Sequence, residues 1–273
     1  MTCKKYRGTG YKLCTDCTKG YVKGVISMSK FFISRENIYG DKLKITGEDV
    51  NHITRVLRLG TGDRLTCCDG MGKDYCVRIS ATDKKEIVCD IESAFKAETE
   101  SSIKVTLIQG IPKVSKMDYI IQKTTELGIS DIYPCKMSRC VSKPDGSKKV
   151  ERWQKIAREA AKQSGRGIVP SVHDIITVSE AVEILKNTDI SFVPYECAEN
   201  AYLRPVLTSK NDVKTVAFMI GPEGGFDKSE IEKLTANNIN IVTLGKRILR
   251  TETAGEAVLS MIMYEIGDIN GGL

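Results

Sequence analysis

The sequence predicts an α/β protein with a mainly parallel sheet, preceded by a smaller β-rich domain. Beyond residue 104, short apolar runs of strand length alternate with amphipathic stretches of helical period, which is the pattern of a parallel sheet covered on both faces. Residues 28–98 instead contain short strand-like runs around one helical stretch. With 273 residues, of which 41% are hydrophobic, the chain is long enough to bury a core in one or two domains.

The first region, residues 28–98, is expected to fold as a small barrel. Its strand-like runs, rich in β-branched and aromatic residues, cover residues 31–33, 42–45, 64–68, 76–80 and 86–91. A helix is predicted over residues 47–59, because apolar residues recur there at core spacing. Asp69-Gly70-Met71-Gly72 and Thr82-Asp83 are typical turn sequences and separate the later strands.

The second region, residues 99–273, is expected to form one domain. Strands are predicted at residues 105–108, 129–134, 190–194, 216–220 and 239–244, and helices at residues 116–127, 150–163 and 179–185. Two further helices are predicted to start at Asp227 and Thr253, because Asp227-Lys228-Ser229-Glu230 and Thr253-Ala254-Gly255-Glu256 both match a capping box. This alternation alone does not distinguish a Rossmann-like winding from a knotted one, and knots are rare.

Two loops of this region are unusual, and we expect both to open on the same edge of the parallel sheet because each follows a predicted strand. The first is Gly221-Pro222-Glu223-Gly224-Gly225-Phe226. Its glycines permit close approach of a ligand to the backbone, but a tight strand-to-helix turn explains them equally well. The loop matches neither GxGxxG nor GxxxxGK[ST], so binding of a pyrophosphate group is not indicated.

The second loop, residues 244–254, has the more specific composition. Around the apolar pair Ile248-Leu249 it places Arg247, Arg250, Thr251, Glu252 and Thr253. This mixture suits a ligand with apolar, amide-like and charged parts. Loops after buried strands commonly form the ligand sites of α/β proteins, because the sheet fixes the loop and the next helix supplies free N–H groups. We therefore expect the functional site at this pair of loops.

The net charge of the chain is concentrated at its N-terminus. Residues 1–27 contain six basic side chains and one acidic side chain, so this segment contributes +5 of the formal net charge of +6. The rest of the chain is almost neutral, and an RNA-binding surface there must come from local clusters of lysine and arginine. We expect residues 1–27 to be a poorly ordered extension. Cys14 and Cys17, with Cys3, form at most part of a zinc site, so no metal is expected.

Composition also bears on where the protein acts. No apolar stretch approaches the roughly 18 residues of a membrane span, and the basic N-terminus is not followed by the apolar segment of a signal peptide. The ten cysteines are scattered, without the framework of a small secreted domain. We therefore expect no membrane partner, a cytoplasmic location and reduced thiols.

The two loops together carry a family resemblance. The sequences GPEGGF and LGKRILRTETA, together with residues 122–128, 138–141 and 152–166, resemble the RsmE family, whose members methylate uridine N3 of 16S ribosomal RNA and belong to the SPOUT class. The resemblance extends from about Met28 to the C-terminus. The chain departs from the family pattern at Ser138, where an acidic residue is common, and at Gly255-Glu256, where small apolar residues are common. Neither departure removes a residue that the reaction needs.

The resemblance implies a fold, a cofactor and an assembly. Residues 99–273 would form a SPOUT-type methyltransferase domain with a C-terminal trefoil knot, and residues 28–98 a PUA-like RNA-binding β-barrel. The cofactor would be S-adenosylmethionine, and the protein would act as a homodimer on 16S ribosomal RNA or the small ribosomal subunit. The residues implied to bind the cofactor lie in the two loops: Gly221, Pro222, Glu223, Gly224, Leu244, Gly245, Arg247, Ile248, Leu249, Thr251, Thr253 and Ala254.

Methylation of uridine N3 requires loss of its proton, and the resulting charge spreads onto the two ring carbonyls. Arg139, Arg166 and Arg250 are the catalytic candidates to stabilise that charge. Glu126 and Glu223 are the candidates to accept the proton. Three of the five have a structural alternative: Glu126 can pair with a neighbour on its helix, Arg166 can cap the preceding helix and Glu223 can orient its loop.

The predicted RNA-binding residues are Lys30, Arg55, Arg58, Lys113 and Lys116. Phosphate contacts need accessible cations, but a solvated surface is the simpler explanation of each cluster taken alone. Two alternatives to the implied function remain open. The chain could methylate another RNA base, because no residue pattern here specifies a base edge, or it could be a non-catalytic RNA-binding ribosome-assembly factor that kept the fold.

Overall fold

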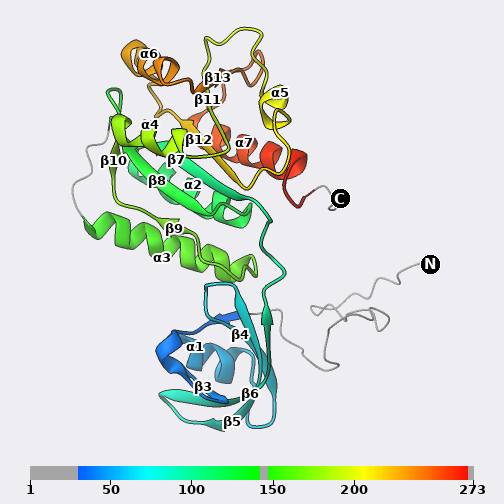
Figure 1. Ribbon diagram of the computed structural model, residues 1–273. Coiled ribbons are helices and arrows are strands. Elements are labelled where there is room, and N and C mark those ends of the chain that lie inside the picture. Colours follow the sequence, from blue (N-terminus) through cyan, green and yellow to red (C-terminus); the bar gives the residue numbers. More distant parts are fainter. Residues whose placement is uncertain (1–29, 142–146, 270–273) are drawn as a thin grey trace, which may run out of the picture.

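The computed structural model describes residues 30–141 and 147–269. The strands within these ranges form two separate sheets, which lie on either side of α3 (Ser147–Gln163) in Figure 1. The basic extension that was predicted to be poorly ordered, including Cys14 and Cys17, lies outside the described residues. A division of the chain into domains after residue 98 stays a prediction.

The first sheet has six strands, hydrogen-bonded in the order β1-β4-β5-β6-β3-β2. Neighbouring strands are antiparallel except β1 and β4, which are parallel. The strands are β1 (Lys30–Phe32), β2 (Ile38–Tyr39), β3 (Lys42–Thr46), β4 (Arg64–Cys68), β5 (Lys73–Thr82) and β6 (Glu86–Lys96). Two register shifts between β5 and β6 increase the local bend and twist. The core on its inner face includes Phe31, Leu43 and Val77.

The predicted helix of this region is shorter and less regular than expected. α1 (Glu48–Asn51) passes directly into a π turn, His52–Val56. In that turn Leu57 N–H donates to His52 O at 3.0 Å, an i to i+5 hydrogen bond. Val56 is one of the apolar residues whose spacing predicted this helix to face the core, but in the π turn it is 69% exposed. Arg58 then ends the turn with a φ of 55°.

The second sheet is entirely parallel, with the order β10-β8-β7-β12-β11-β13 and with β9 paired to β8. Its strands are β7 (Lys104–Gly110), β8 (Asp131–Lys136), β9 (Ser171–Val172), β10 (Ile176–Thr177), β11 (Ile190–Pro194), β12 (Thr215–Ile220) and β13 (Asn240–Val242). Besides α3, its helices are α2 (Val114–Glu126), α4 (Val178–Lys186), α5 (Leu203–Leu207), α6 (Lys228–Ala236) and α7 (Thr251–Glu265). The strands and helices predicted for this region are confirmed, whereas β9, β10 and α5 were not predicted because segments so short carry no period.

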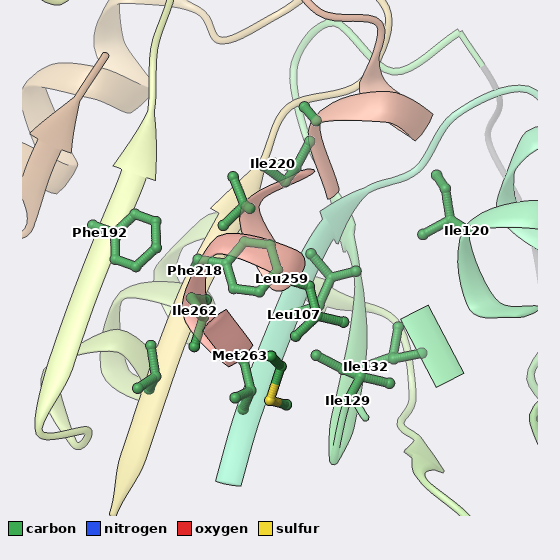
Figure 2. Packing of buried hydrophobic residues seen from close by; sticks show 14 of the residues in the cluster. Leu107, Ile120, Ile129, Ile132, Phe192, Phe218, Ile220, Leu259, Ile262 and Met263 are labelled. Atoms are coloured by element: carbon green, nitrogen blue, oxygen red, sulfur yellow. The ribbon is translucent and has the colours of Figure 1, made fainter. Parts of the chain in front are cut away.

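Helices cover both faces of this sheet, so alternate residues of each strand enter different cores. On one face, Phe218 and Ile220 of β12 pack in a cluster with residues of α2, α3, α5 and α7. On the other face, Ala217 and Met219 pack with residues of α4 and α6. Figure 2 shows the first of these clusters, in which Phe218 of the sheet lies beside Leu259 of α7. Because helices cover both faces, a strand of this sheet is apolar at almost every position, as the sequence analysis predicted.

The two predicted capping boxes have different outcomes. α6 begins after Asp227, and both capping-box bonds are present with Glu230, as predicted. The predicted start of α7 at Thr253 is wrong, because the helix begins at Thr251 with Arg250 in the N-cap position and no side-chain cap. The physical reason is that the Thr251 hydroxyl bonds to groups in the sheet and in the first loop, which fixes the chain in the helix two residues early.

The first sheet packs against α3 and the segment that follows it. Gly72 N–H donates to Gly167 O at 3.0 Å, and Phe32 and Cys68 form a small apolar cluster with Ala161 of α3. An ion pair joins Lys162 of α3 to Asp49 of α1, and Figure 1 shows α3 lying between the two sheets. The two sheets are therefore connected by hydrogen bonds, apolar packing and charge, in addition to the chain itself.

The helices and the cysteines bear on two of the predictions from composition. Within the described ranges, no helix is long and apolar enough to cross a membrane. The cysteines in the same ranges are all free, and most are buried. Burial raises the pKa of the Cys68 and Cys89 thiols to about 12. These thiols are therefore protonated and chemically unreactive at neutral pH.

Candidate functional site

The direction of the chain connections reverses between β7 and β12, which are parallel neighbours in the second sheet. β7 connects through α2 to β8 on one side, whereas β12 connects through α6 to β13 on the other. Open α/β sheets bind ligands at the carboxyl ends of strands at such a reversal. The two loops predicted to hold the site follow β12 and β13, and the prediction that both open on one edge of the sheet is confirmed.

A buried hydrogen-bond network ties β7, the first loop and α7 together. The Gln109 side chain, at the end of β7, is fully buried, and its Nε2 donates to Thr251 Oγ1 at 2.9 Å. The Thr251 hydroxyl in turn donates to Gly221 O at 2.7 Å. Sequence reasoning missed Gln109. The available signal was a polar residue directly after an apolar strand whose end lies at the same edge as the two loops.

The first loop also packs closely against its surroundings. A Cβ atom at Gly110 of β7 would lie 2.7 Å from Pro222 N, so only glycine allows this approach. At Gly224 a Cβ atom would lie 2.9 Å from Arg139 Cβ. Pro222 itself is buried. The first loop is therefore in close contact with β7 on one side and with Arg139 on the other.

Charged side chains join the first loop to the starts of α2 and α7. Lys116 Nζ of α2 lies 3.5 Å from Glu223 Oε1 and 3.1 Å from Glu252 Oε2. Lys113 N–H donates to Glu223 Oε1 at 3.1 Å. Burial acts to raise the pKa of Glu252, but its own backbone N–H, Lys116 and Arg250 together lower the pKa below its ordinary value. Glu252 was not among the predicted binding residues, although it stands between two that were.

Arg139, one of the catalytic candidates, follows β8 and contacts the first loop. Its Nη1 donates to Gly224 O at 3.2 Å, and its Nη2 lies 3.5 Å from Asp227 Oδ2. The pKa of Asp227 is lowered, first by the side chain and backbone N–H of Ser229 and then by Arg139. About half of the Arg139 side chain remains exposed, so the guanidinium is accessible to a ligand.

The second loop presents free groups to solvent. Ile248 is 85% exposed, and the exposed Arg250 side chain makes no hydrogen bond or ion pair with the described residues. In residues 246–249 the backbone N–H groups donate to no other group within 30–141 and 147–269. Leu244 and Leu249 are partly buried against the core. The loop is thus anchored by two leucines and open between them.

These features fit S-adenosylmethionine, the cofactor that the resemblance implies. An adenine ring needs apolar contact and hydrogen bonds to its edge, which Ile248 and the free backbone amides of residues 246–249 can supply. Gly245 has a φ of 96° and open space at its Cβ position, so the backbone there is accessible to a ligand. Carboxylates and backbone carbonyls nearby can accept hydrogen bonds from hydroxyl and ammonium groups.

Comparison with known proteins decides the family. Residues 99–263 match the RNA methyltransferase domain family, and residues 45–92 match the RNA methyltransferase PUA domain. Ribosomal RNA small subunit methyltransferase E of Bacillus subtilis (strain 168) is 36% identical over 234 residues, which cover 83% of this chain and 91% of the relative. The chain belongs to the ribosomal RNA small subunit methyltransferase E family.

Solved structures agree with this membership. The crystal structure of ribosomal RNA small subunit methyltransferase E from Neisseria gonorrhoeae bound to S-adenosyl methionine is similar, with a TM-score of 0.79 and 31% identity; the match covers 89% of this chain and 100% of that chain. A putative methyltransferase from Legionella pneumophila with bound S-adenosyl methionine has a TM-score of 0.76 and 29% identity, covering 91% of this chain and 100% of that chain. The predicted family and the predicted order, a PUA-like domain followed by an α/β methyltransferase domain, are confirmed.

In this family member Arg166 lies away from the two loops. Its side chain is buried, and Nη1 donates to Thr125 O at 3.1 Å and to Ile129 O at 2.7 Å, while Nη2 pairs with Glu100 at 2.7 Å. Thr125 O lies in the last turn of α2 and Ile129 O follows that helix, at the amino edge of the sheet, whereas the loops lie at the carboxyl edge. The Arg166 side chain therefore caps α2, not the preceding helix considered as the alternative, and it lies apart from the two loops.

Glu126 also lies at the far end of α2. Lys123 Nζ contacts both of its carboxylate oxygens at 3.0 Å, which is the helix-surface pair considered as its alternative. Glu126 and Thr253 line a groove between α2 and α7 together with Glu256. Burial raises the pKa of Glu256. Glu126 and Thr253 thus line the same groove, and Arg139 and Gly224 are not among the residues that line it.

The predicted RNA-binding residues fall into two groups. Lys30 pairs with Asp74 at 2.7 Å and its side chain is only 11% exposed, so burial disfavours contact with RNA. Lys116 is occupied by the two carboxylates described above. Arg55, Arg58 and Lys113 are exposed, and their side chains make no ion pair with the described residues.

Proposed function

We propose that this protein transfers a methyl group from S-adenosylmethionine to N3 of a uridine in 16S ribosomal RNA of the small ribosomal subunit. The observation that carries this proposal is the second loop, which opens at the carboxyl edge of the sheet with an exposed Ile248; among the described residues, its Arg250 side chain has no partner and the backbone N–H groups of residues 246–249 have no acceptor. Family membership supports the same reaction, because the relatives are named for methylation of small-subunit ribosomal RNA. We expect the protein to act in the cytoplasm, where ribosomes are assembled.

The two loops provide the cofactor site. When bound, S-adenosylmethionine supplies a methyl group on a positively charged sulfur, and transfer requires an in-line nucleophile. We assign direct contact to Gly224, Gly245, Arg247 and Ile248, which are accessible. Pro222, Thr251 and Ala254 are buried and hold the walls of the site in place. The C-terminal trefoil knot and the homodimer implied by the resemblance belong to this proposal.

The uridine site lies next to the same loops. Arg139 and Arg250 flank the first loop and the start of α7, and either can stabilise the charge that develops on a uridine carbonyl oxygen when N3 loses its proton. Glu223 is the better-placed proton acceptor than Glu126, because it belongs to the first loop. Arg55, Arg58 and Lys113 are accessible cations for the phosphates of the RNA.

Mass spectrometry of nucleosides tests the proposed reaction. The purified protein is incubated with S-adenosylmethionine and either naked small-subunit RNA or assembled subunits. The expected product is N3-methyluridine with at least one of the two substrates. A different methylated nucleoside would support a SPOUT methyltransferase for another base, and no methylation of either substrate would support a binding protein without activity.

Substitution of Arg250 tests the chemical role of the second loop. Arg250→Ala is expected to leave the thermal unfolding midpoint unchanged, since the side chain makes no bond within the described residues, and to lower methyl transfer by on the order of a hundredfold. Arg204→Ala is the control for methyl transfer, because Arg204 is an exposed arginine on α5 outside the two loops; it pairs with Glu265, so it is not a control for the unfolding midpoint. Transfer by Arg250→Ala at the wild-type rate would remove Arg250 from the reaction.

A further inference from the structure

Lys116 occupies a position between two carboxylates that come from the two different loops. Its ammonium lies 3.5 Å from Glu223 Oε1 of the first loop and 3.1 Å from Glu252 Oε2 at the end of the second. The three side chains are 30%, 22% and 17% exposed respectively, so water screens them only in part. One cation on α2 thus bridges the two segments that form the walls of the site.

The two carboxylates depend on this cation to different degrees. Glu223 Oε1 also accepts the Lys113 N–H at 3.1 Å, at the N-terminus of α2. Glu252 Oε2 is buried, and within the described residues it has no hydrogen-bond partner of good geometry besides the charge contact with Lys116. Removal of the ammonium would leave two negative charges facing the same partly buried space, and like charges there repel.

The bridge fixes a different part of the first loop from the buried network. Gln109 and Thr251 hold Gly221, the first residue of the loop. Lys116 and the Lys113 N–H hold Glu223, two residues further along. Both ties end at the first turn of α7, because Thr251 and Glu252 are adjacent. Without the Lys116 bridge, Glu223 and the start of α7 would no longer be linked.

On the basis of the function proposed above, we propose that Lys116 is a positioning residue that sets the spacing of the two loops for the cofactor, and that it is not a contact to RNA phosphate. Its ammonium lies within 3.5 Å of two carboxylates that already neutralise it, whereas the neighbouring Lys113 side chain is exposed and makes no ion pair with the described residues. The two lysines, one helical turn apart, therefore have separate roles: Lys116 for the cofactor site and Lys113 for the RNA.

Two binding measurements separate these roles. Isothermal titration gives the Kd for S-adenosylmethionine, and filter binding over a range of salt concentrations gives the Kd for small-subunit RNA. Lys116→Met is expected to weaken binding of S-adenosylmethionine by on the order of tenfold and to leave RNA binding and its salt dependence unchanged. Lys113→Met, the matched control, is expected to show the reverse pattern.

Second-site variants exclude a general loss of structure. Glu252→Gln combined with Lys116→Met removes the unpaired carboxylate and is expected to recover part of the lost affinity for S-adenosylmethionine. Lys116→Arg keeps the charge and is expected to lie near wild type. If Lys116→Met does not fold, Lys116→Arg and Glu252→Gln decide: a bridge predicts that Lys116→Arg binds the cofactor with near wild-type affinity and that Glu252→Gln, which removes the charge at one end of the bridge, binds it more weakly.

The result that would overturn the assignment is a Lys116→Met protein with wild-type affinity for S-adenosylmethionine and with weaker, less salt-dependent RNA binding. Failure of the proposed function would look different. In that case the wild-type protein itself would produce no methylated nucleoside, whatever the affinities of the Lys116 variants for the cofactor.

Discussion

At the scale of single residues, the site depends on side chains whose partners are far away in the sequence. Thr251 was predicted to bind the cofactor, but its hydroxyl is buried, accepts a hydrogen bond from Gln109 and donates one to Gly221. Arg166 and Arg250 are both arginines in matching motifs, yet one is buried against carbonyls and the other is exposed. Residue type alone does not distinguish such cases, because burial is a property of the whole fold.

Replacement of Thr251 measures the buried network. Thr251→Val keeps the shape of the side chain but removes one of the two acceptors of the Gln109 amide, which keeps only Gly110 O, and removes the donor to Gly221 O. We expect the free energy of unfolding to fall by about 1–3 kcal/mol, the cost of an unsatisfied buried polar group. Urea denaturation provides the measurement. Thr253→Val, a change at an exposed threonine on the same helix, is expected to have no measurable effect; equal losses for the two variants would contradict the network.

At the scale of elements, α7 carries a glycine in its first turns that the structure does not require. Gly255 is helical, and a Cβ atom there would meet only Gln109 Oε1 at 3.8 Å, an ordinary contact distance. The glycine therefore adds conformational freedom to the unfolded chain without relieving any crowding in the folded one.

We expect Gly255→Ala to raise the free energy of unfolding by about 0.5–1 kcal/mol, because alanine restricts the unfolded chain and fits the helix. Gly128→Ala is the contrasting control. Gly128 has a φ of 96°, and a Cβ atom there would lie 3.1 Å from Met263 Cε, so alanine is expected to destabilise the protein. Urea unfolding of both variants checks the signs, and a destabilised Gly255→Ala would show that the first turns of α7 have no room.

Some helices and strands were easier to predict from the sequence than others. The long helices and the buried strands of the second sheet were predicted because each spans enough residues to show a period. The start of α7 was misplaced because a local capping pattern competed with the contacts of Thr251 outside its own helix. The π turn after α1 was missed because the spacing of apolar residues over a single turn does not distinguish i to i+5 hydrogen bonds from those of an α-helix.

At the scale of the whole molecule, the junction between the two sheets is tightly fitted. At Gly167, next to the end of β6, a Cβ atom would overlap the Cβ atom of Ala97. Gly167 O also accepts the N–H of Gly72, and Gly72 O accepts the N–H of Ala97. Any side chain at Gly167 must therefore push the two sheets apart or break these hydrogen bonds.

Gly167→Ala is accordingly expected to lower the thermal unfolding midpoint by several degrees, equivalent to about 1–3 kcal/mol of overpacking, and to broaden or split the calorimetric transition as the two sheets lose their coupling. Gly60→Ala is the control, because a Cβ atom there meets nothing within 4 Å and its φ is not positive. A single transition at the wild-type temperature for Gly167→Ala would mean that the junction yields at little cost.

Patterns in the amino-acid sequence were sufficient to predict the class of fold, most of the elements and the two loops that form the candidate site. These features depend on local periodicity, on turn residues and on motifs contiguous in the chain, including those that carried the family resemblance. The prediction that both loops open on one edge also followed, because parallel strands place their carboxyl ends together.

Which side chains of the site are exposed, and which are held in hydrogen bonds or ion pairs, could not be predicted without the three-dimensional fold. Gln109, 142 residues from Thr251 in the sequence, fixes that residue, and Lys116 joins two carboxylates from separate loops. Arg166 and Lys30 are withdrawn into buried pairs, whereas Arg250 and Ile248 remain open. Such assignments depend on long-range contacts, and the cost of leaving a buried polar or charged group unpaired makes those contacts selective.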